Sequence, residues 1–355
     1  MILNLSRLGK SGTGMWQYSI KLLDALHELN QLEGIICAQM HEECFKKYNC
    51  LIFTVPDWVS NTSKISKLRP ILWFLYSFIM YFRLKKKLLG KNILSTTHHY
   101  LPFFKNQIIT IHDLRPYFYP DSLLQKIYFR YLLSRNIGKL LHILTVSETV
   151  KDQISLSYRV SKDKISVIHN AIDVNEFEFK ENNKNNPFLL AVGASWKHKN
   201  IHTLLENYQT WINKYRLVIV SGETEYADYL KLKGEELGII NSIDFLHGIS
   251  FSKLKELYAS ASALVYPSLD EGFGIPPLEA FASGTPAIVS QIPVFVEILE
   301  DCAIYVDPNS AESWIDAFKK LEDANDQDFE ELRKYAEKYD LNNMKSMFIN
   351  FTKKL

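Results

Sequence analysis

The chain has 355 residues, of which 47% are hydrophobic and 23% are charged. This length exceeds a typical single domain and suits two, and the composition excludes a disordered or fibrous protein. The net charge of +1 conceals an asymmetry, because residues 1–176 carry 23 basic and 13 acidic side chains and residues 177–355 carry 18 and 27. A basic half favours an anionic partner such as a phosphorylated substrate or a lipid surface, although the charges could equally attract two domains to each other.

A short apolar run at 1–4 predicts a first strand, and it lacks the pattern of a signal peptide. The loop Gly9-Lys-Ser-Gly12-Thr-Gly14 follows and leads into a helix-like pattern over 17–29. Glycines allow a backbone to approach a ligand closely, and the N–H groups at a helix start attract phosphate. The loop is neither a Walker motif nor a full G-x-G-x-x-G, so taken alone it favours a plain strand-to-helix turn.

Three of the four cysteines (Cys37, Cys44, Cys50 and Cys302) lie near His41. Their spacing matches no usual zinc pattern, and the four form no regular disulfide framework. We therefore expect no metal site and a reducing, cytoplasmic location.

The longest apolar run covers residues 71–82 (ILWFLYSFIMYF). Twelve residues are too few for a helix to cross a bilayer, which takes about 20. Basic residues flank the run, and the segment between Trp58 and His112 contains nine basic residues and no acidic one. Residues 64–91 could therefore rest on an anionic membrane as an interfacial helix. The alternative is a buried helix with a charged end.

Short β-rich runs alternate with helix-like stretches along both halves of the chain. The runs are 34–38, 107–111 and 142–146 in the first half, and 188–192, 217–220, 243–246, 263–266 and 287–290 in the second. The clearest helical patterns after the first are 201–212 and 252–261. Such alternation predicts βαβ units and parallel sheets. The polar segment 181–187 marks a linker, so we expect two doubly wound α/β domains joined near residue 180, with the site in the cleft between them.

His112 stands at the end of a predicted strand, in Thr110-Ile-His112-Asp-Leu. An imidazole in that position could hydrogen-bond a sugar hydroxyl or share a proton. A single histidine is more often structural.

A second strand end carries a cluster of basic residues, Lys197-His198-Lys199, at the start of the expected helix over 201–212. Cations at a helix N-terminus suit a diphosphate whose negative charge grows as it leaves. A solvated basic turn is the alternative.

Two glutamates, Glu271 and Glu279, stand eight residues apart in Pro267-Ser-Leu-Asp-Glu-Gly-Phe-Gly-Ile-Pro-Pro-Leu-Glu-Ala. A helix starting near Pro276 or Pro277 would place Glu279 in its first turn, beside unpaired N–H groups. One carboxylate could bind a ribose diol while the other faces a sugar. Paired carboxylates are also typical of glycoside hydrolysis.

Taken together, these segments resemble the retaining glycosyltransferases of family 4 (group 1 type), which have the GT-B fold, and among them bacterial mannosyltransferases of surface polysaccharide assembly. The spacing Glu271-x7-Glu279 resembles the family signature almost throughout. The glycine loop, TIHDL, LTVSETVKDQI, VIHNAID, the Lys199-Asn200 turn and the stretch 294–307 follow in the family's order.

The resemblance implies an α/β GT-B enzyme of two Rossmann-like domains. The expected divisions are an acceptor-binding domain over 1–178, a nucleotide-sugar-binding domain over 179–340 and a C-terminal helix over 341–355 that packs back on the first domain. Glu279 would bind the ribose, and Lys199 and His198 the diphosphate. The remaining implied contacts are Glu271, Gly272, Phe273 and Gly274 with the donor sugar, Gly12 and Gly14 with the diphosphate, and His112 with the transferred sugar.

The implied mechanism is retaining and front-face, with the leaving diphosphate deprotonating the acceptor hydroxyl and with no cofactor or metal. The sequence departs from the family at His198, where arginine is usual, and at Ala171, where glycine is usual. Because histidine supplies a fixed charge less dependably than arginine, Lys197 could share its role.

We therefore expect a cytoplasmic glycosyltransferase that moves a hexose to a lipid-linked or growing saccharide in O-antigen or other surface polysaccharide synthesis, at the inner face of the membrane. GDP-mannose is favoured over a UDP- or dTDP-sugar, and no nucleic-acid partner is expected. The alternatives are a GT-B enzyme of other chemistry, such as a phosphorylase or epimerase, and a non-catalytic nucleotide-sugar binder.

Overall fold

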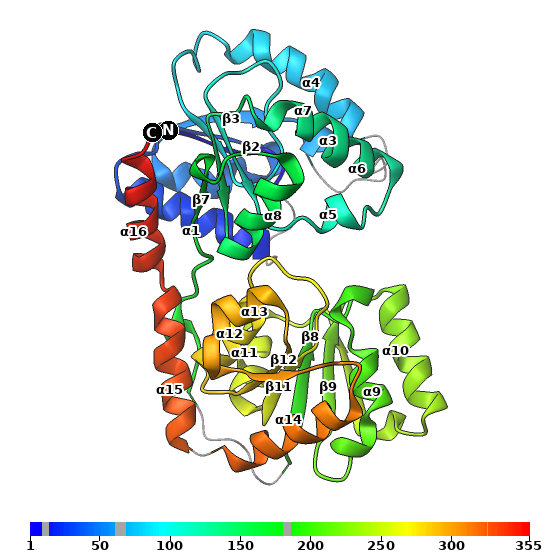
Figure 1. The fold of residues 1–355 in the computed structure, drawn as a ribbon. Coiled ribbons are helices and arrows are strands. Elements are labelled where there is room, and N and C mark those ends of the chain that lie inside the picture. Colours follow the sequence, from blue (N-terminus) through cyan, green and yellow to red (C-terminus); the bar gives the residue numbers. More distant parts are fainter. Residues whose placement is uncertain (9–13, 61–68, 180–185, 325) are drawn as a thin grey trace. The chain divides into compact units, whose positions relative to one another are not determined.

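The computed structural model describes residues 1–8, 14–60, 69–179, 186–324 and 326–355. The chain forms two compact units (Figure 1), Met1–Ala171 together with Leu341–Leu355, and Ile172–Asp340. Each unit contains its own parallel sheet with helices around it, so the predicted fold of two doubly wound α/β domains is confirmed. Most of the linker predicted at 181–187 lies outside the described residues.

The first sheet has seven parallel strands in the order β3-β2-β1-β4-β5-β6-β7. Most of its strands are buried along their whole length, which explains why they read as continuous apolar runs. The strands are β1 (Ile2–Leu5), β2 (Gly34–Ala38), β3 (Leu51–Val55), β4 (Ile93–Ser95), β5 (Gln107–Ile111), β6 (His142–Thr145) and β7 (Ile165–Val167).

The helices of the first unit lie between these strands in the chain, except for the C-terminal one. They are α1 (Gly14–Glu28), α2 (Glu42–Phe45), α3 (Asp57–Ser60), α4 (Arg69–Leu84), α5 (Arg115–Phe118), α6 (Leu123–Ile127), α7 (Ser134–Ile137), α8 (Glu148–Tyr158) and α16 (Leu341–Thr352). α1 buries a stripe that includes Tyr18, Leu22 and Leu26. Ser147 precedes α8 as its N-cap, and its side chain accepts a hydrogen bond from Val150 N.

The second sheet has six parallel strands in the order β10-β9-β8-β11-β12-β13. The strands are β8 (Phe188–Val192), β9 (Arg216–Ser221), β10 (Ile243–His247), β11 (Ala263–Tyr266), β12 (Ala287–Ser290) and β13 (Ile304–Val306). The helices are α9 (His202–Glu206), α10 (Glu225–Glu236), α11 (Phe251–Ser260), α12 (Ile275–Ala282), α13 (Pro293–Leu299), α14 (Ala311–Asp323) and α15 (Asp326–Ala336).

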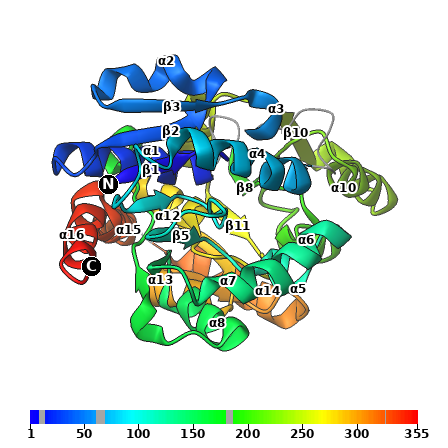
Figure 2. The ribbon, with the colours of Figure 1, turned by 90° about the horizontal axis from the view of Figure 1, so that it is seen from above.

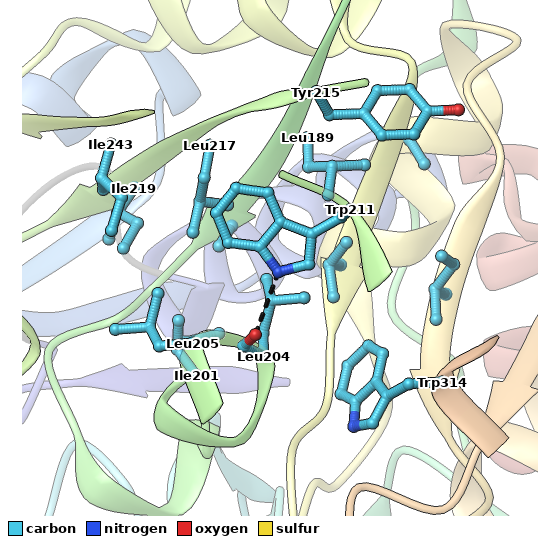
Figure 3. Close-up of a cluster of buried hydrophobic side chains, with 14 of the residues drawn as sticks. Leu189, Ile201, Leu204, Leu205, Trp211, Tyr215, Leu217, Ile219, Ile243 and Trp314 are labelled. Carbon is cyan, nitrogen blue, oxygen red and sulfur yellow. Dashed lines mark hydrogen bonds between the residues drawn. The ribbon is translucent and has the colours of Figure 1, made fainter. Parts of the chain in front are cut away.

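The core of the second unit packs around two tryptophans, Trp211 and Trp314, which are almost wholly buried (Figure 3). Trp211 Nε1 donates a hydrogen bond of 3.0 Å to the Leu204 carbonyl, so the indole is buried without losing a partner. The expected helix over 201–212 is wrong in length, because α9 ends at Glu206. Asn207 follows, and its side-chain Nδ2 donates to the Thr203 carbonyl, a local bond that competes with continued helix.

The C-terminal helix α16 belongs to the first unit, where it packs against α1. Met344, Phe348 and Phe351 are buried, and Lys345 pairs with Glu28. Both chain ends lie beside this helix in Figures 1 and 2.

The apolar run at 71–82 forms most of α4. Its inner face, with Trp73, Tyr76 and Met80, packs into the first core. Its outer side chains are exposed. The helix is therefore buried on one face only, and the interpretation as a fully buried helix is wrong. No helix in the described part of the chain is long and apolar enough to cross a membrane.

Candidate functional site

The topology of the second sheet brings Lys199 and Glu271 together. β8 and β11 are neighbours at the point where the strand order reverses, which is where open α/β sheets bind ligands. Lys199 ends a 3₁₀ turn (Lys197–Lys199) that follows β8, and Glu271 lies in the loop that follows β11. Residues far apart in sequence therefore meet at the carboxyl edge of one sheet.

Lys199 Nζ lies 2.5 Å from Glu271 Oε1 and donates a second hydrogen bond of 2.6 Å to Tyr266 Oη. Ser268 Oγ donates to the same Glu271 oxygen at 2.7 Å. The ion-paired side chains are only 13% and 15% exposed. The arrangement is therefore a desolvated ion pair held by further hydrogen bonds, not a surface salt bridge.

The environment favours the charged form of both partners. Burial alone would raise the pKa of Glu271, but the Lys199 charge and the hydrogen bonds from Lys199, Ser268 and Tyr266 outweigh it and lower that pKa. Burial opposes the charge of Lys199 in the same way, and its contacts with Tyr266 and Glu271 raise its pKa above the ordinary value. Lysine and glutamate are therefore both ionised at neutral pH.

Gly274 turns the chain from the Glu271 loop into α12. Its φ of +106° lies in the left-handed region, and a Cβ there would come within 2.9 Å of the Phe295 ring. Glycine is therefore required both by backbone conformation and by space. The neighbouring Phe273 is buried against Tyr339, so its ring is used for packing, and Gly272 is partly exposed.

Glu279 does not lie in the first turn of a helix, as the sequence suggested. α12 begins at Ile275, with Gly274 as its N-cap, so Glu279 falls in the second turn. Pro276 and Pro277 are accommodated inside the start of the helix because the first N–H groups have no helical partner to lose. The carboxylate is 6% exposed and accepts a hydrogen bond of 2.9 Å from Tyr258 Oη on α11.

The two other basic residues of the turn differ from Lys199. Lys197 is exposed, whereas His198 is partly buried. The His198 carbonyl accepts a hydrogen bond of 2.9 Å from Leu269 N, which ties the basic turn to the loop that carries Glu271. The backbone of both loops is thereby held in one arrangement.

His112 lies in the first unit, directly after β5. Its Nε2 is 2.8 Å from the Thr96 carbonyl oxygen, which follows β4, and its ring meets Tyr18 edge-on with centroids 4.7 Å apart. A carbonyl oxygen only accepts, so Nε2 carries the hydrogen and Nδ1 keeps a lone pair. Burial lowers the pKa of His112, although the Thr96 hydrogen bond partly opposes this. The imidazole is therefore neutral at pH 7 and presents an acceptor.

The glycine loop is only partly described. Gly12 lies outside the described residues, and Gly14 is the exposed first residue of α1, after β1. Among the described residues, no group of three or more histidine, cysteine or acidic side chains is placed to hold a metal ion.

The structure adds residues that the sequence analysis did not single out. Tyr266 and Ser268 complete the surroundings of the Lys199–Glu271 pair, and Tyr258 is the partner of Glu279. Tyr266 and Ser268 lie at the β11 end, where parallel sheets place ligand contacts, so their position was a usable signal. Tyr258 lies on α11, and no pattern in the sequence pointed to it as a partner of Glu279.

Comparisons with known proteins agree with this architecture. Residues 44–176 match the family model described as Glycosyltransferase Family 4, and residues 173–340 match that of Glycosyl transferases group 1. The chain is 50% identical over 351 residues, 99% of each chain, to the O-antigen chain mannosyltransferase RfbU of Salmonella typhimurium strain LT2.

Two solved structures share the fold across nearly the whole chain. Sucrose-phosphate synthase from Thermosynechococcus elongatus superposes with a TM-score of 0.77 at 17% identity, covering 99% of this chain and 98% of its own. A glycosyltransferase from Rickettsia africae gives 0.73 at 18% identity, covering 99% and 97%. At these identities the likeness is one of fold alone, and it confirms the GT-B prediction.

Proposed function

Because this chain belongs to the group 1, family 4 glycosyltransferases, we propose that it transfers a mannosyl residue from a nucleotide sugar to a growing O-antigen saccharide, with retention of configuration. The observation that carries this proposal is the 50% identity, over 99% of both chains, to an O-antigen chain mannosyltransferase. The buried Lys199–Glu271 pair supplies the matching chemistry.

Lys199 is proposed to bind the donor diphosphate. An ammonium group has three N–H donors, and Glu271 and Tyr266 accept two of them. The third is then available to a phosphate oxygen, and its charge-assisted bond strengthens as negative charge develops on the leaving diphosphate. The partly buried His198, on the same turn, is proposed to add a weaker contact.

The two glutamates are proposed to hold the two sugars of the donor. The bonds from Lys199 and Ser268 both reach Glu271 Oε1, and the carboxylate keeps further lone pairs on Oε2 with which to accept from a hydroxyl of the transferred sugar. The backbone of Gly272, Phe273 and Gly274 would contact the same sugar. Glu279 would accept hydrogen bonds from the ribose hydroxyls, with Tyr258 holding its carboxylate in place.

His112 is proposed to accept a hydrogen bond from a hydroxyl of the transferred sugar through Nδ1, the nitrogen that the Thr96 bond leaves with a lone pair. Gly12 and Gly14 would approach the diphosphate. The acceptor hydroxyl attacks the anomeric carbon on the face that the diphosphate leaves, and its proton passes to the diphosphate oxygen. No covalent glycosyl-enzyme is required.

GDP-mannose is the proposed donor, because the Lys199-Asn200 turn has the form found in mannosyltransferases that use it. We propose a lipid-linked saccharide as acceptor, and therefore action at the inner face of the cytoplasmic membrane with peripheral association through residues 64–91. One alternative is a UDP- or dTDP-sugar donor. A second is a non-catalytic nucleotide-sugar binder, which the histidine at 198 in place of arginine would favour.

A donor screen by thermal unfolding tests the proposal. A ligand present at about 100 times its Kd stabilises the native state by about 2.7 kcal/mol, which should raise Tm by about 5–10 °C. GDP-mannose should do so more than UDP-glucose or dTDP-glucose, and incubation with a lipid-linked saccharide should release GDP. A response to UDP-glucose alone would refute the donor, and binding without transfer to any saccharide would favour the non-catalytic alternative.

A further inference from the structure

The outer face of α4 is apolar along its length. Six large hydrophobic side chains recur there at helical spacing, each 47–59% exposed. They are Ile71, Phe74, Leu75, Phe78, Ile79 and Phe82, and together with Phe103 they are called the α4 face below. Exposed apolar patches that are this continuous mark interaction sites in folded proteins.

The helix α14 of the second unit shows what an ordinary outer face looks like in the same chain. It also packs one side on its core, through Trp314 and Phe318. Its exposed positions carry charges, including Asp316, Lys319 and Lys320, and Ile315 is a lone apolar exception. The apolar composition of the α4 face is therefore not a general property of this protein's helices.

Phe103 completes the α4 face at a conformational cost. Its φ of +75° is the left-handed region, which a bulky residue rarely adopts. Its ring is 49% exposed and lies 5.8 Å from Phe74 and 5.7 Å from Phe78, centroid to centroid. This conformation belongs to the turn Leu101–Phe104, in which Phe104 N donates a hydrogen bond of 3.3 Å to the Leu101 carbonyl. The turn holds the Phe103 ring beside α4, where it extends the exposed apolar surface.

A lysine-walled pocket of about 300 Å³ adjoins the foot of α4. Lys85, Lys91 and Lys105 line it together with Tyr81 and the Phe103 loop, and no acidic residue lines it. Lys91 pairs with Glu33, while neither of the other two lysines has an ion-pair partner among the residues that the structure describes. The pocket therefore offers ammonium groups to a phosphate-sized anion beside an apolar surface.

The positive charge around the α4 face indicates which kind of partner binds there. The segment from Trp58 to His112 contains nine basic residues and no acidic one. A second copy of the chain seated on this face by two-fold symmetry would bring these lysines against one another, which disfavours it. An anionic lipid surface instead pairs the cations with phosphates and buries the exposed rings at the headgroup boundary.

Extending the peripheral membrane association proposed above, we infer that the α4 face lies in the interface of an anionic phospholipid bilayer while the pocket between Lys85 and Lys105 holds a lipid phosphate. The helix runs along the membrane plane, as its continuous apolar stripe requires. The pocket then fixes the depth and rotation of the first unit on the surface.

Co-sedimentation of the full-length protein with vesicles tests the inference. The protein should bind vesicles of phosphatidylcholine mixed with phosphatidylglycerol far more tightly than phosphatidylcholine alone. The double variant Lys85→Ala/Lys105→Ala should weaken that binding by more than about 30-fold. Two cations near an anionic surface account for about 1 kcal/mol each, and the charge-assisted hydrogen bonds to the bound phosphate are lost in addition. Adding free inorganic phosphate or glycerol phosphate should leave wild-type binding unchanged if the phosphate must belong to a lipid in the bilayer.

The chain offers a matched control in Lys86→Ala/Lys87→Ala, which removes the same charge next to Lys85 but from outside the pocket. It should lose clearly less binding. Equal losses in the two double variants would refute the lipid-phosphate site in the pocket. A non-specific electrostatic attraction to the surface would then account for the contribution of these lysines. Equal binding to anionic and neutral vesicles would refute the inference that the α4 face binds an anionic membrane.

Two further variants examine the apolar contribution. Phe78→Ser should abolish most vesicle binding, whereas Leu156→Ser, at an 84% exposed position on α8, should leave it unchanged. Phe103→Gly should raise Tm, because glycine adopts the left-handed conformation without strain, and yet weaken vesicle binding. A change of oligomeric state in Phe78→Ser, with no vesicle binding by the wild type, would show instead that the face joins two copies.

These outcomes are separable from the proposed glycosyl transfer. GDP release with the saccharide acceptor dispersed in detergent should be unchanged in all of these variants. Loss of vesicle binding with full activity in detergent supports the membrane face, and vesicle binding by an inactive wild type would refute the transfer while leaving the face in place.

Discussion

In the second unit the ends of β8 and β11 bring an ammonium group and a carboxylate into a buried ion pair, Lys199 with Glu271. In the first unit the ends of β4 and β5 bring a carbonyl and a neutral imidazole together, Thr96 with His112. Both pairs stand at the carboxyl edge of a parallel sheet, where this fold presents side chains to ligands. The fold therefore determines where a contact is made, and the residue determines its charge. We therefore propose that the charged pair binds the diphosphate and that the histidine binds a neutral hydroxyl.

The largest expected effect is on Glu279 in the second unit. Glu279→Ala should weaken nucleotide-sugar binding about 100-fold, because hydrogen bonds to a buried carboxylate contribute about 1.5–3 kcal/mol each. Isothermal titration measures the change, with Glu312→Ala on the exposed start of α14 as the control. Because the variant also strands the Tyr258 hydroxyl, Glu279→Ala/Tyr258→Phe should recover stability without recovering binding. Recovered binding in that pair would leave Glu279 a purely structural role.

The ion pair itself comes next. Lys199→Met or Glu271→Gln alone should lower the free energy of unfolding by about 3 kcal/mol, because each leaves a buried partner without its counter-charge. The double variant should cost clearly less than the sum, a coupling that urea unfolding measures. Donor binding should nonetheless be lost in the double variant. Additive losses would mean that Lys199 and Glu271 are not coupled. The contrast between an ion pair in the second unit and a neutral contact in the first would then be refuted.

For the neutral His112 of the first unit we expect an effect on kcat and little effect on donor affinity. His112→Phe keeps a ring against Tyr18 but removes the Nδ1 acceptor, so kcat should fall about tenfold, the equivalent of one hydrogen bond, while donor affinity changes little. Steady-state kinetics separate the two parameters. A loss of donor affinity as large as that of Lys199→Met would show that the two units do not divide the work in this way.

Acid should affect the two units to different extents. In the first unit, burial lowers the pKa of His112 below 6.5, of His98 to about 3 and of His142 to about 4. The unfolded chain binds protons that these folded imidazoles do not, so the first unit should lose stability as pH falls below about 6.5. The stabilising contribution of Glu271, whose folded pKa is lowered despite burial, is complete above 4.5 and is lost only as pH falls through that lower value.

Burial also lowers the pKa of His202 in the second unit. Hydrogen exchange measured from pH 7 to pH 5 should therefore show both units opening more readily, the first unit, with the three histidines named above, more than the second. His142→Phe, in β6, should reduce the pH dependence of the first unit. A larger change in the second unit than in the first would contradict this order.

The smallest effect concerns the basic turn. His198→Arg should strengthen donor binding about threefold, because arginine keeps its charge at every physiological pH and can bind a phosphate with two N–H groups. Weaker binding would show that the surroundings of the partly buried His198 leave no room for a guanidinium.

Sequence patterns predicted much of this fold because parallel strands are buried on both faces and read as apolar runs. The runs at 107–111 and 188–192 coincide with β5 and β8. The pattern failed at 201–212, where α9 ends at Glu206 and the side chain of Asn207 bonds back to the Thr203 carbonyl. It also placed Glu279 one turn too early, since the first turn of α12 accommodates two prolines that looked like a start.

Sequence alone determined which residues could carry charge at the strand ends, since Lys199, Glu271 and His112 each follow an apolar run that folds as a strand. Only the tertiary structure decided that Lys199 and Glu271 meet, that Tyr258 supports Glu279, and that the outer face of α4 stays uncovered. The physical reason is range. A strand or helix follows from the period of neighbouring side chains, whereas a buried ion pair or an exposed apolar stripe depends on which distant segment, if any, packs against it.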